Sequence, residues 1–123
     1  MRKIKFRGKD NHSEWFFGGI TEDKKFIANK FTFIGVRPET VGQFTGFYDK
    51  HDKEIYEGDV VQFHNAPYLV KWLDRIGCFV VENELTFMTL VNTESYNCRI
   101  VGNIHDDPNL FQKLEAEFIH KIN

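Results

Sequence analysis

The stretch that decides the fold reads EGDVVQFHNAPYLVKW and spans residues 57–72. It holds two short runs rich in β-branched and aromatic residues, 60–63 and 68–72, separated by a polar turn that contains a proline. Such runs predict strands, and the turn between them predicts an antiparallel connection. Similar runs continue to residue 104 at a spacing of roughly ten residues, which is typical of a small barrel or sandwich. The pattern predicts a five-stranded barrel or strongly bent sheet over residues 58–104.

The N-terminal part predicts a second antiparallel β layer over residues 2–46. Its candidate strands are residues 2–9, 14–21, 25–34 and 39–44. In the first of them, Ile4 and Phe6 alternate with basic residues, which is the period of a strand with one apolar face. We expect this layer to join the second one through Phe44, Phe47 and Tyr56.

The C-terminal end changes to helical periodicity. Asp107 offers an N-cap, and Pro108 suits the first helical position. One amphipathic helix over 108–122 is predicted by the spacing of its apolar residues, Leu110, Phe111, Leu114, Phe118 and Ile122. These residues must cover the same chain or a second chain. The first four are therefore candidate oligomerisation residues, although Glu115, Glu117 and Lys121 leave a polar outer face that favours packing within one chain.

The predicted fold class is therefore mainly β (α+β), with two small antiparallel β subdomains and one C-terminal helix. The expected boundaries are 1–47 for the N-terminal β subdomain, 48–107 for the C-terminal one and 108–123 for the helix, all within one structural unit. The residues expected to be largely buried are Phe6, Trp15, Phe17, Phe44, Tyr56, Val60, Phe63, Val70, Trp72, Phe79, Val81, Ile100 and Ile104.

The composition of the 123 residues fits a folded domain. The net charge is only −2, and 41% of the residues are hydrophobic and 15% aromatic, which argues against disorder. No apolar run approaches the length of a membrane span, and the opening residues do not form a signal peptide. Two cysteines, Cys78 and Cys98, are too few for a disulfide framework. We therefore expect reduced thiols and a cytoplasmic location, with no membrane association.

The sharpest electrostatic feature is the basic face of the first strand, formed by Lys3, Lys5, Arg7 and Lys9. The first nine residues contain five basic and no acidic side chains. Cations about 6.6 Å apart along a strand could follow a phosphodiester backbone. A solvated edge strand protected by lysines would show the same pattern. These four residues are the candidate nucleic-acid-binding site.

Other chemistry is weakly supported. None of the five histidines has zinc-motif spacing, and His105-Asp106-Asp107 fits a helix cap better than a metal site. No phosphate-binding loop or nucleophile elbow is present. The carboxylates Glu54, Glu57 and Asp59 fit turn and register roles better than acid–base catalysis. The tryptophans and tyrosines could stack on bases, although such residues are more often core. We expect no catalytic residue, metal or cofactor.

Three stretches resemble the YopX family of phage and prophage proteins. The opening Ile4-Lys5-Phe6-Arg7 with Trp15 to Gly18 is similar to its start. The central ETVGQFTG (39–46), DK (49–50) and KEIYEGDVV (53–61) resemble its most specific motif. The ending IVGNI (100–104) followed by DPNL (107–110) is also similar. His51-Asp52 departs from the family pattern, which usually has an Asn-Gly-type turn there.

The resemblance implies a mainly β protein with a small helical part, encoded by phages or prophages of low-GC Gram-positive bacteria. It assigns no catalytic residues, because the molecular function of the family is not established. In addition, Gly58-Asp59-Val60-Val61 resembles the first strand entry of SH3-like barrels, an analogy at the level of fold.

Two functions remain open from the sequence. The first is a non-enzymatic binding module for nucleic acid or for a host protein that processes nucleic acid, so the expected partner is nucleic acid or a host or phage protein. The alternative is a structural or assembly protein that forms homo-oligomers through its C-terminal helix.

Overall fold

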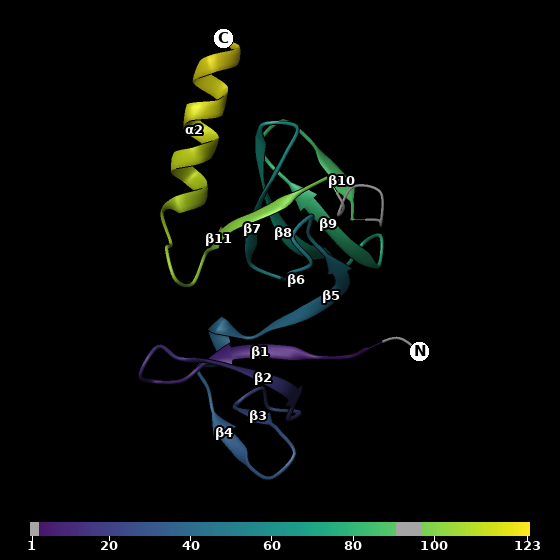
Figure 1. Cartoon of the computed structure of the whole chain (residues 1–123), viewed down its shortest axis with the longest axis vertical. Coiled ribbons are helices and arrows are strands. Elements are labelled where there is room, and N and C mark those ends of the chain that lie inside the picture. The colour runs from purple at the N-terminus through teal and green to yellow at the C-terminus, as the bar shows by residue number, and fades with distance from the viewer. Residues whose placement is uncertain (1–2, 91–96) are drawn as a thin grey trace. The chain divides into compact units, whose positions relative to one another are not determined.

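The computed structural model describes residues 3–90 and 97–123. The chain divides into two compact units, residues 1–46 and residues 47–123, here called the N-terminal unit and the C-terminal unit. Figure 1 labels their strands and the C-terminal helix. The predicted mainly β architecture, with two antiparallel sheets and one C-terminal helix, is confirmed.

The N-terminal unit is a small antiparallel sheet. Its elements are β1 (Phe6–Lys9), β2 (Trp15–Ile20), β3 (Phe26–Ala28), β4 (Phe33–Gly35), the 3-10 turn η1 (Pro38–Thr40) and the start of β5 (Gly42–Tyr48). The strand order is β4-β3-β2-β1-β5, and β6 (Glu54–Tyr56) of the C-terminal unit follows β5. The single strand expected over 25–34 is thus a hairpin, because Asn29 turns the chain back: its backbone N–H donates to Thr32 O at 3.0 Å.

One face of the N-terminal sheet forms a compact apolar layer. Ile20 pairs with Ile27, and Ile27 pairs with Ile34, so the three side chains share a face. Ile27 is fully buried. A Cβ added at Gly8 would lie 3.1 Å from Val36 Cβ, so the glycine permits Val36 to pack directly on β1.

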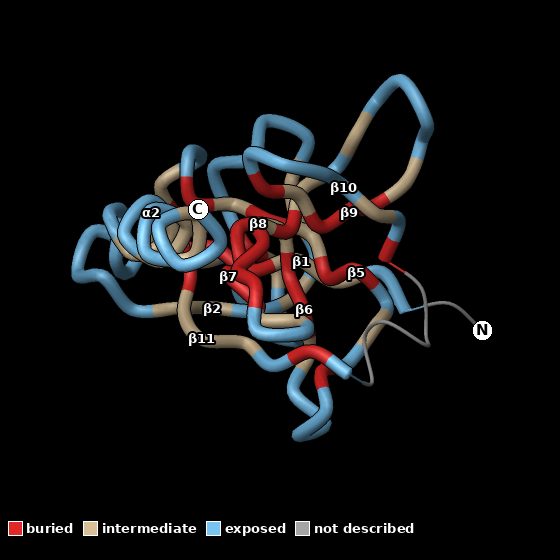
Figure 2. The backbone as a smooth tube through the Cα atoms, turned by 90° about the horizontal axis from the view of Figure 1, so that it is seen from above, coloured by how far each residue is buried: buried red, intermediate tan, exposed pale blue. Residues whose placement is uncertain are grey.

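The C-terminal unit contains the predicted five-stranded sheet. Its strands are β7 (Asp59–Phe63), β8 (Ala66–Leu73), β9 (Cys78–Glu82), β10 (Phe87–Thr89) and β11 (Arg99–Asn103), in the order β10-β9-β8-β7-β11. All described pairs are antiparallel. The sheet is open between β10 and β11 in the described parts of the chain. The core lies over β7, β8 and β9, where Figure 2 shows buried backbone in red; Val61, Val70 and Val81 belong to it.

The predicted core list is right in part. Six members are buried: Phe44, Tyr56, Val60, Val70, Phe79 and Val81. Five are half-buried: Phe6, Trp15, Phe63, Ile100 and Ile104.

Phe17 and Trp72 were expected in the core and are exposed, at 48% and 40%. Trp72 lies near the end of β8, where its ring packs edge-on against Phe79 with centroids 5.0 Å apart. Its indole Nε1–H donates to Asp74 Oδ1 at 2.7 Å at the strand end. Period-two spacing identifies a face, whereas burial depends on which element covers that face.

The C-terminal helix α2 (Leu110–Ile122) begins two residues later than predicted. Asn109 rather than Asp107 is the N-cap, without a side-chain cap bond. The segment before the helix forms turns instead: Asn103 Oδ1 accepts the backbone N–H groups of His105 and Asp106 at 3.0 and 2.8 Å. Asp107 Oδ1 accepts the Asn109 N–H at 3.3 Å.

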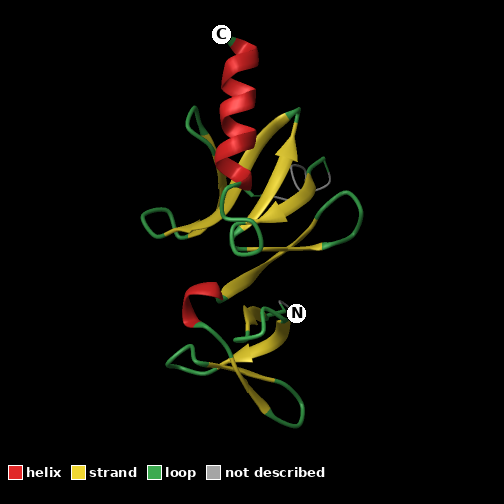
Figure 3. Cartoon of the chain, turned by 90° about the vertical axis from the view of Figure 1, so that its left-hand side faces the viewer, coloured by secondary structure: helices red, strands yellow, loops and turns green. Residues whose placement is uncertain are grey.

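The helix packs on its own chain. Phe118 contacts the core of the C-terminal unit, and α2 lies against β8 and β11. In Figure 3 this helix is the long red ribbon that leads to the C-terminus. At β11 a Cβ on Gly102 would collide with Leu110 Cδ2, so the glycine allows the first helical turn to approach the strand. The joining of the two layers through Phe44, Phe47 and Tyr56 stays a prediction.

Candidate nucleic-acid interface

The basic first strand does not present the solvated stripe that its sequence predicts. Strand β1 lies between β2 and β5, so it is not an edge strand, which removes the aggregation-protection explanation. Lys3 is exposed and Lys5 half-buried, whereas Arg7 and Lys9 are only 8% and 5% exposed. The expectation of four exposed cations is therefore wrong for Arg7 and Lys9.

Arg7 and Lys9 lie against an aromatic ring. Arg7 pairs with Phe17 and Lys9 with Trp15 across β1 and β2, which places all four side chains on one face. The Arg7 Cζ lies 4.5 Å and the Lys9 Nζ 5.4 Å from the Trp15 ring centroid. These are cation–π distances, so Trp15 stabilises both cations and holds them in place.

The same face of the sheet continues into β3 and β4 as an aromatic surface. Gly19 pairs with Ala28, and Ala28 pairs with Phe33, so Phe33 lies on the face of Phe17. Phe26 is two residues from Ala28 and shares this face. We call Phe17, Phe26 and Phe33, together with Phe31 of the turn between β3 and β4, the aromatic face.

Small residues separate the rings of the aromatic face. Gly35 lies opposite Phe26, and a Cβ added to it would be 3.9 Å from Phe26 Cε1. Phe26 and Phe33 are 41% and 66% exposed. Phe31, in the β3–β4 turn, is 88% exposed, with Lys30 Nζ 5.5 Å from its ring centroid. Solvent-exposed phenylalanines on a glycine-bearing sheet make a surface on which planar rings can stack.

The charge of the chain divides along the unit boundary. The N-terminal unit has nine Lys and Arg against five Asp and Glu, a net charge of +4. The C-terminal unit has seven against thirteen, a net charge of −6. Lys24, Lys25 and Lys30 are exposed on the β2–β4 segment. The small overall charge of −2 therefore conceals a basic unit that carries the aromatic face.

The central motif residues have structural roles. Asp49 is 1% exposed, and its Oδ1 accepts the backbone N–H groups of His51 and Lys53 at 2.8 and 3.0 Å. Its Oδ2 accepts the N–H of Ile100 at 3.0 Å. Burial raises the pKa of Asp49, but these three donors outweigh it, so the pKa lies below its ordinary value. Asp52 takes the left-handed φ of 62° that this turn requires, a conformation that Asp tolerates.

Asp59 and Gly58 fix the entry to β7. Asp59 is 1% exposed, and its Oδ2 accepts the Tyr56 N–H at 2.8 Å. Gly58 has a φ of 91°, and its carbonyl accepts the Ile104 N–H at 3.0 Å. The Tyr56 hydroxyl donates to Glu54 Oε1 at 2.9 Å. These contacts connect β6, β7 and the end of β11, so these motif residues have a structural role.

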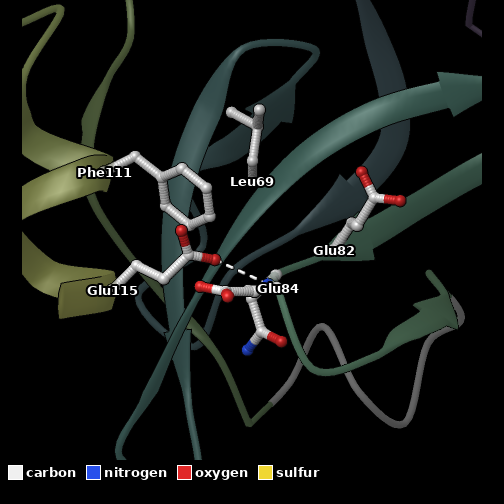
Figure 4. Close-up of a pocket in the computed structure, with 6 residues that line it drawn as sticks. Leu69, Glu82, Glu84, Phe111 and Glu115 are labelled. Atoms are coloured by element: carbon white, nitrogen blue, oxygen red, sulfur yellow. Dashed lines mark hydrogen bonds between the residues drawn. The ribbon is translucent and has the colours of Figure 1, made fainter. Parts of the chain in front are cut away.

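A cleft of about 360 Å³ lies between α2 and the sheet of the C-terminal unit (Figure 4). Its lining residues are Leu69, Glu82, Asn83, Glu84, Phe111 and Glu115. Glu115 Oε2 accepts the Glu84 N–H at 2.6 Å, and Glu82 pairs with Lys71 at 2.8 Å. The three carboxylates of the cleft disfavour the binding of phosphate. The hydrogen bond between Glu115 and Glu84 holds the helix on the sheet.

Neither a metal cluster nor a membrane-spanning helix is found in the described part of the chain. No group of three or more His, Cys, Asp or Glu among the described residues could hold a metal ion. None of the helices formed by those residues is long and apolar enough to cross a membrane.

The comparison with protein families agrees with the central motif. The YopX protein family profile matches residues 2–112 of the 123. The chain belongs to the YopX family. No curated protein matches this YopX-family chain. Among solved structures it is similar to the crystal structure of protein EF1440 from Enterococcus faecalis, with a TM-score of 0.57 and 22% identity. That match covers 90% of this chain and 99% of the other, and it supports the shared fold.

The sequence did not identify the aromatic face as a site. Phe26, Phe31 and Phe33 were assigned to a strand but not to binding. The available signal was the closeness of three phenylalanines to Lys25 and Lys30 in a segment rich in small residues. It could not be used, because the face of each ring depends on the Asn29 turn.

Proposed function

We propose that this YopX-family protein is a non-enzymatic binding module for single-stranded nucleic acid, with the aromatic face as its contact surface. The observation that carries the proposal is the exposure of Phe26, Phe31 and Phe33 on the basic unit of an otherwise acidic chain. Proteins that bind single strands combine aromatic side chains, on which bases stack, with cations along the backbone path.

The roles of the basic residues follow from their placement. Lys24, Lys25 and Lys30 are exposed and close in sequence to Phe26 and Phe31, so they are the phosphate contacts of the proposal. Lys3 and Lys5 of the predicted basic strand extend this set, with Lys5 Nζ 5.8 Å from the Phe44 ring centroid. Arg7 and Lys9 are buried against Trp15 and are not among these phosphate contacts.

The test is fluorescence anisotropy of labelled single-stranded DNA and RNA with the full chain at low salt. A double variant, Phe31→Ala with Phe33→Ala, removes two exposed rings without touching the buried Ile27 layer. Base–aromatic stacking is worth about 1–3 kcal/mol per base, so we expect binding to weaken at least about tenfold. Phe87→Ala, which removes a 40% exposed ring from the C-terminal unit, is the matched control and should bind as the parent does.

Salt dependence separates the contribution of the lysines. The slope of log K against log salt is negative, and each lost phosphate contact reduces its magnitude by about 0.7 for a single strand. Lys30→Gln should therefore give a shallower slope and weaker binding on every sequence tested. Absence of binding to any single strand at low salt, or equal binding by the double Phe variant and its parent, would refute the proposal.

The alternative, assembly through the C-terminal helix, is less well supported. Leu110 contacts Gly102, and Phe118 contacts the core of the same chain, so part of the apolar helix face already has an intramolecular partner. The finer assignment of the C-terminal sheet as SH3-like, the phage origin and the cytoplasmic location remain proposals. The five-strand antiparallel order supports the first of these, and family membership supports the second.

A further inference from the structure

A polar pocket of about 150 Å³ lies in the C-terminal unit, whereas the aromatic face belongs to the N-terminal unit. It is lined by Lys50, Gln62, His64, Asn65, Asn97 and Arg99. None of these described lining residues is acidic, although the unit as a whole has a net charge of −6. Two permanent cations and an imidazole thus gather where the surrounding unit is negative.

The Arg99 side chain is fixed by its neighbour on the adjacent strand. Arg99 on β11 pairs directly with Gln62 on β7, and its Nη2 donates to Gln62 Oε1 at 2.7 Å. The Lys50 backbone lies beside the residue that precedes β11, because its N–H donates to Cys98 O at 2.9 Å. The Arg99 guanidinium is therefore held by Gln62 before any ligand arrives, which reduces the ordering cost of binding.

A tight turn between β7 and β8 supplies two further residues that line the pocket, His64 and Asn65. Phe63 pairs with Ala66, so His64 and Asn65 alone connect β7 to β8. Both have left-handed backbones, with φ of 51° and 66°, as a two-residue hairpin turn requires. The His64 ring lies on Phe63 with centroids 4.1 Å apart. The turn therefore places an imidazole and an amide at the pocket.

We propose that this pocket binds a phosphate group. A guanidinium, an ammonium and side-chain amides carry the N–H donors that phosphate oxygens accept. The volume of about 150 Å³ leaves room for one phosphate group. The group can come from free inorganic phosphate or from the 5′-phosphate end of a nucleic acid.

The test is a two-dimensional amide NMR titration of the full chain at constant ionic strength. Three ligands are compared: inorganic phosphate, a short 5′-phosphorylated oligonucleotide and the same oligonucleotide with a 5′-hydroxyl. We expect saturable shifts of Asn65, Asn97 and Arg99 signals with both phosphate ligands. Tighter binding of the 5′-phosphorylated strand than of inorganic phosphate would assign the site to nucleic-acid ends, and equal binding would assign it to the free anion.

Arg99→Gln should weaken phosphate binding at least about tenfold, because it removes a charged donor. The matched control is Arg75→Gln, which removes an exposed cation that lies over Phe87 in the same unit, and it should leave binding within about twofold. Shifts that do not saturate, or an equal loss in both Arg variants, would overturn the proposal. The variant Phe31→Ala with Phe33→Ala should still bind phosphate at this pocket. The experiment can therefore refute the phosphate pocket and the aromatic face separately.

Discussion

Replacing Asp49 by Asn tests whether the family motif is a structural framework. The substitution keeps the size of the side chain and leaves one oxygen, which can still accept the His51 and Lys53 N–H groups. The new amide NH₂ then faces the Ile100 N–H, a donor against a donor. The variant therefore loses one bond to a charged acceptor and leaves a backbone donor without its partner.

The expected cost is about 2–4 kcal/mol, since a hydrogen bond to a charged group contributes about 1.5–3 kcal/mol and an unsatisfied buried donor adds to it. This is a large part of the stability of a small domain. The assay is urea unfolding at pH 7 followed by Trp72 fluorescence, in a Trp15→Phe background so that only the C-terminal unit reports. Asp52→Asn removes the same charge from an exposed position of the same turn, and should stay within about 0.5 kcal/mol of its parent.

The pH dependence gives a second, independent check. The pKa of Asp49 is lowered in the folded state, so its ionised form contributes stability above the unfolded pKa of about 3.9. That contribution is lost as the pH falls through the lower, folded pKa. The stability gap between the parent and Asp49→Asn should therefore shrink on acidification. A gap below about 0.5 kcal/mol at pH 7, or one that widens in acid, would refute the structural role.

Three further predictions concern the C-terminal unit. Phe79→Ala should lower its stability by about 3–5 kcal/mol in urea unfolding, and a change of melting temperature within a degree or two would contradict its core position. Leu114→Asp with Phe118→Asp should destabilise the chain without changing its size by light scattering, because Phe118 packs on its own core; a folded, smaller species would instead indicate intermolecular packing. Burial, with a smaller effect of the Asp49 charge, raises the pKa of the Cys98 thiol to about 11. Cys98 should therefore react with a thiol reagent at pH 8 far more slowly than the half-buried Cys78, and equal rates would contradict this burial.

Local sequence determined the elements of this protein. Alternating apolar residues and turn residues at short spacing specify strands, so the five strands between residues 58 and 104 and the C-terminal helix were predictable. The central motif was also sufficient to identify the family. These features depend on contacts between residues close in the sequence, which periodicity and turn chemistry report directly.

Tertiary structure alone decided which faces are covered. The sequence pattern of Arg7 and Lys9 is that of a solvated stripe, but β1 lies inside the sheet and Trp15 lies against both cations. Phe17 has the pattern of a core residue and is exposed. The polar pocket of the C-terminal unit is lined by residues from three separate segments of the chain, at Lys50, at 62–65 and at 97–99. Burial and convergence depend on strand order and register, which arise from long-range pairing that no local period encodes.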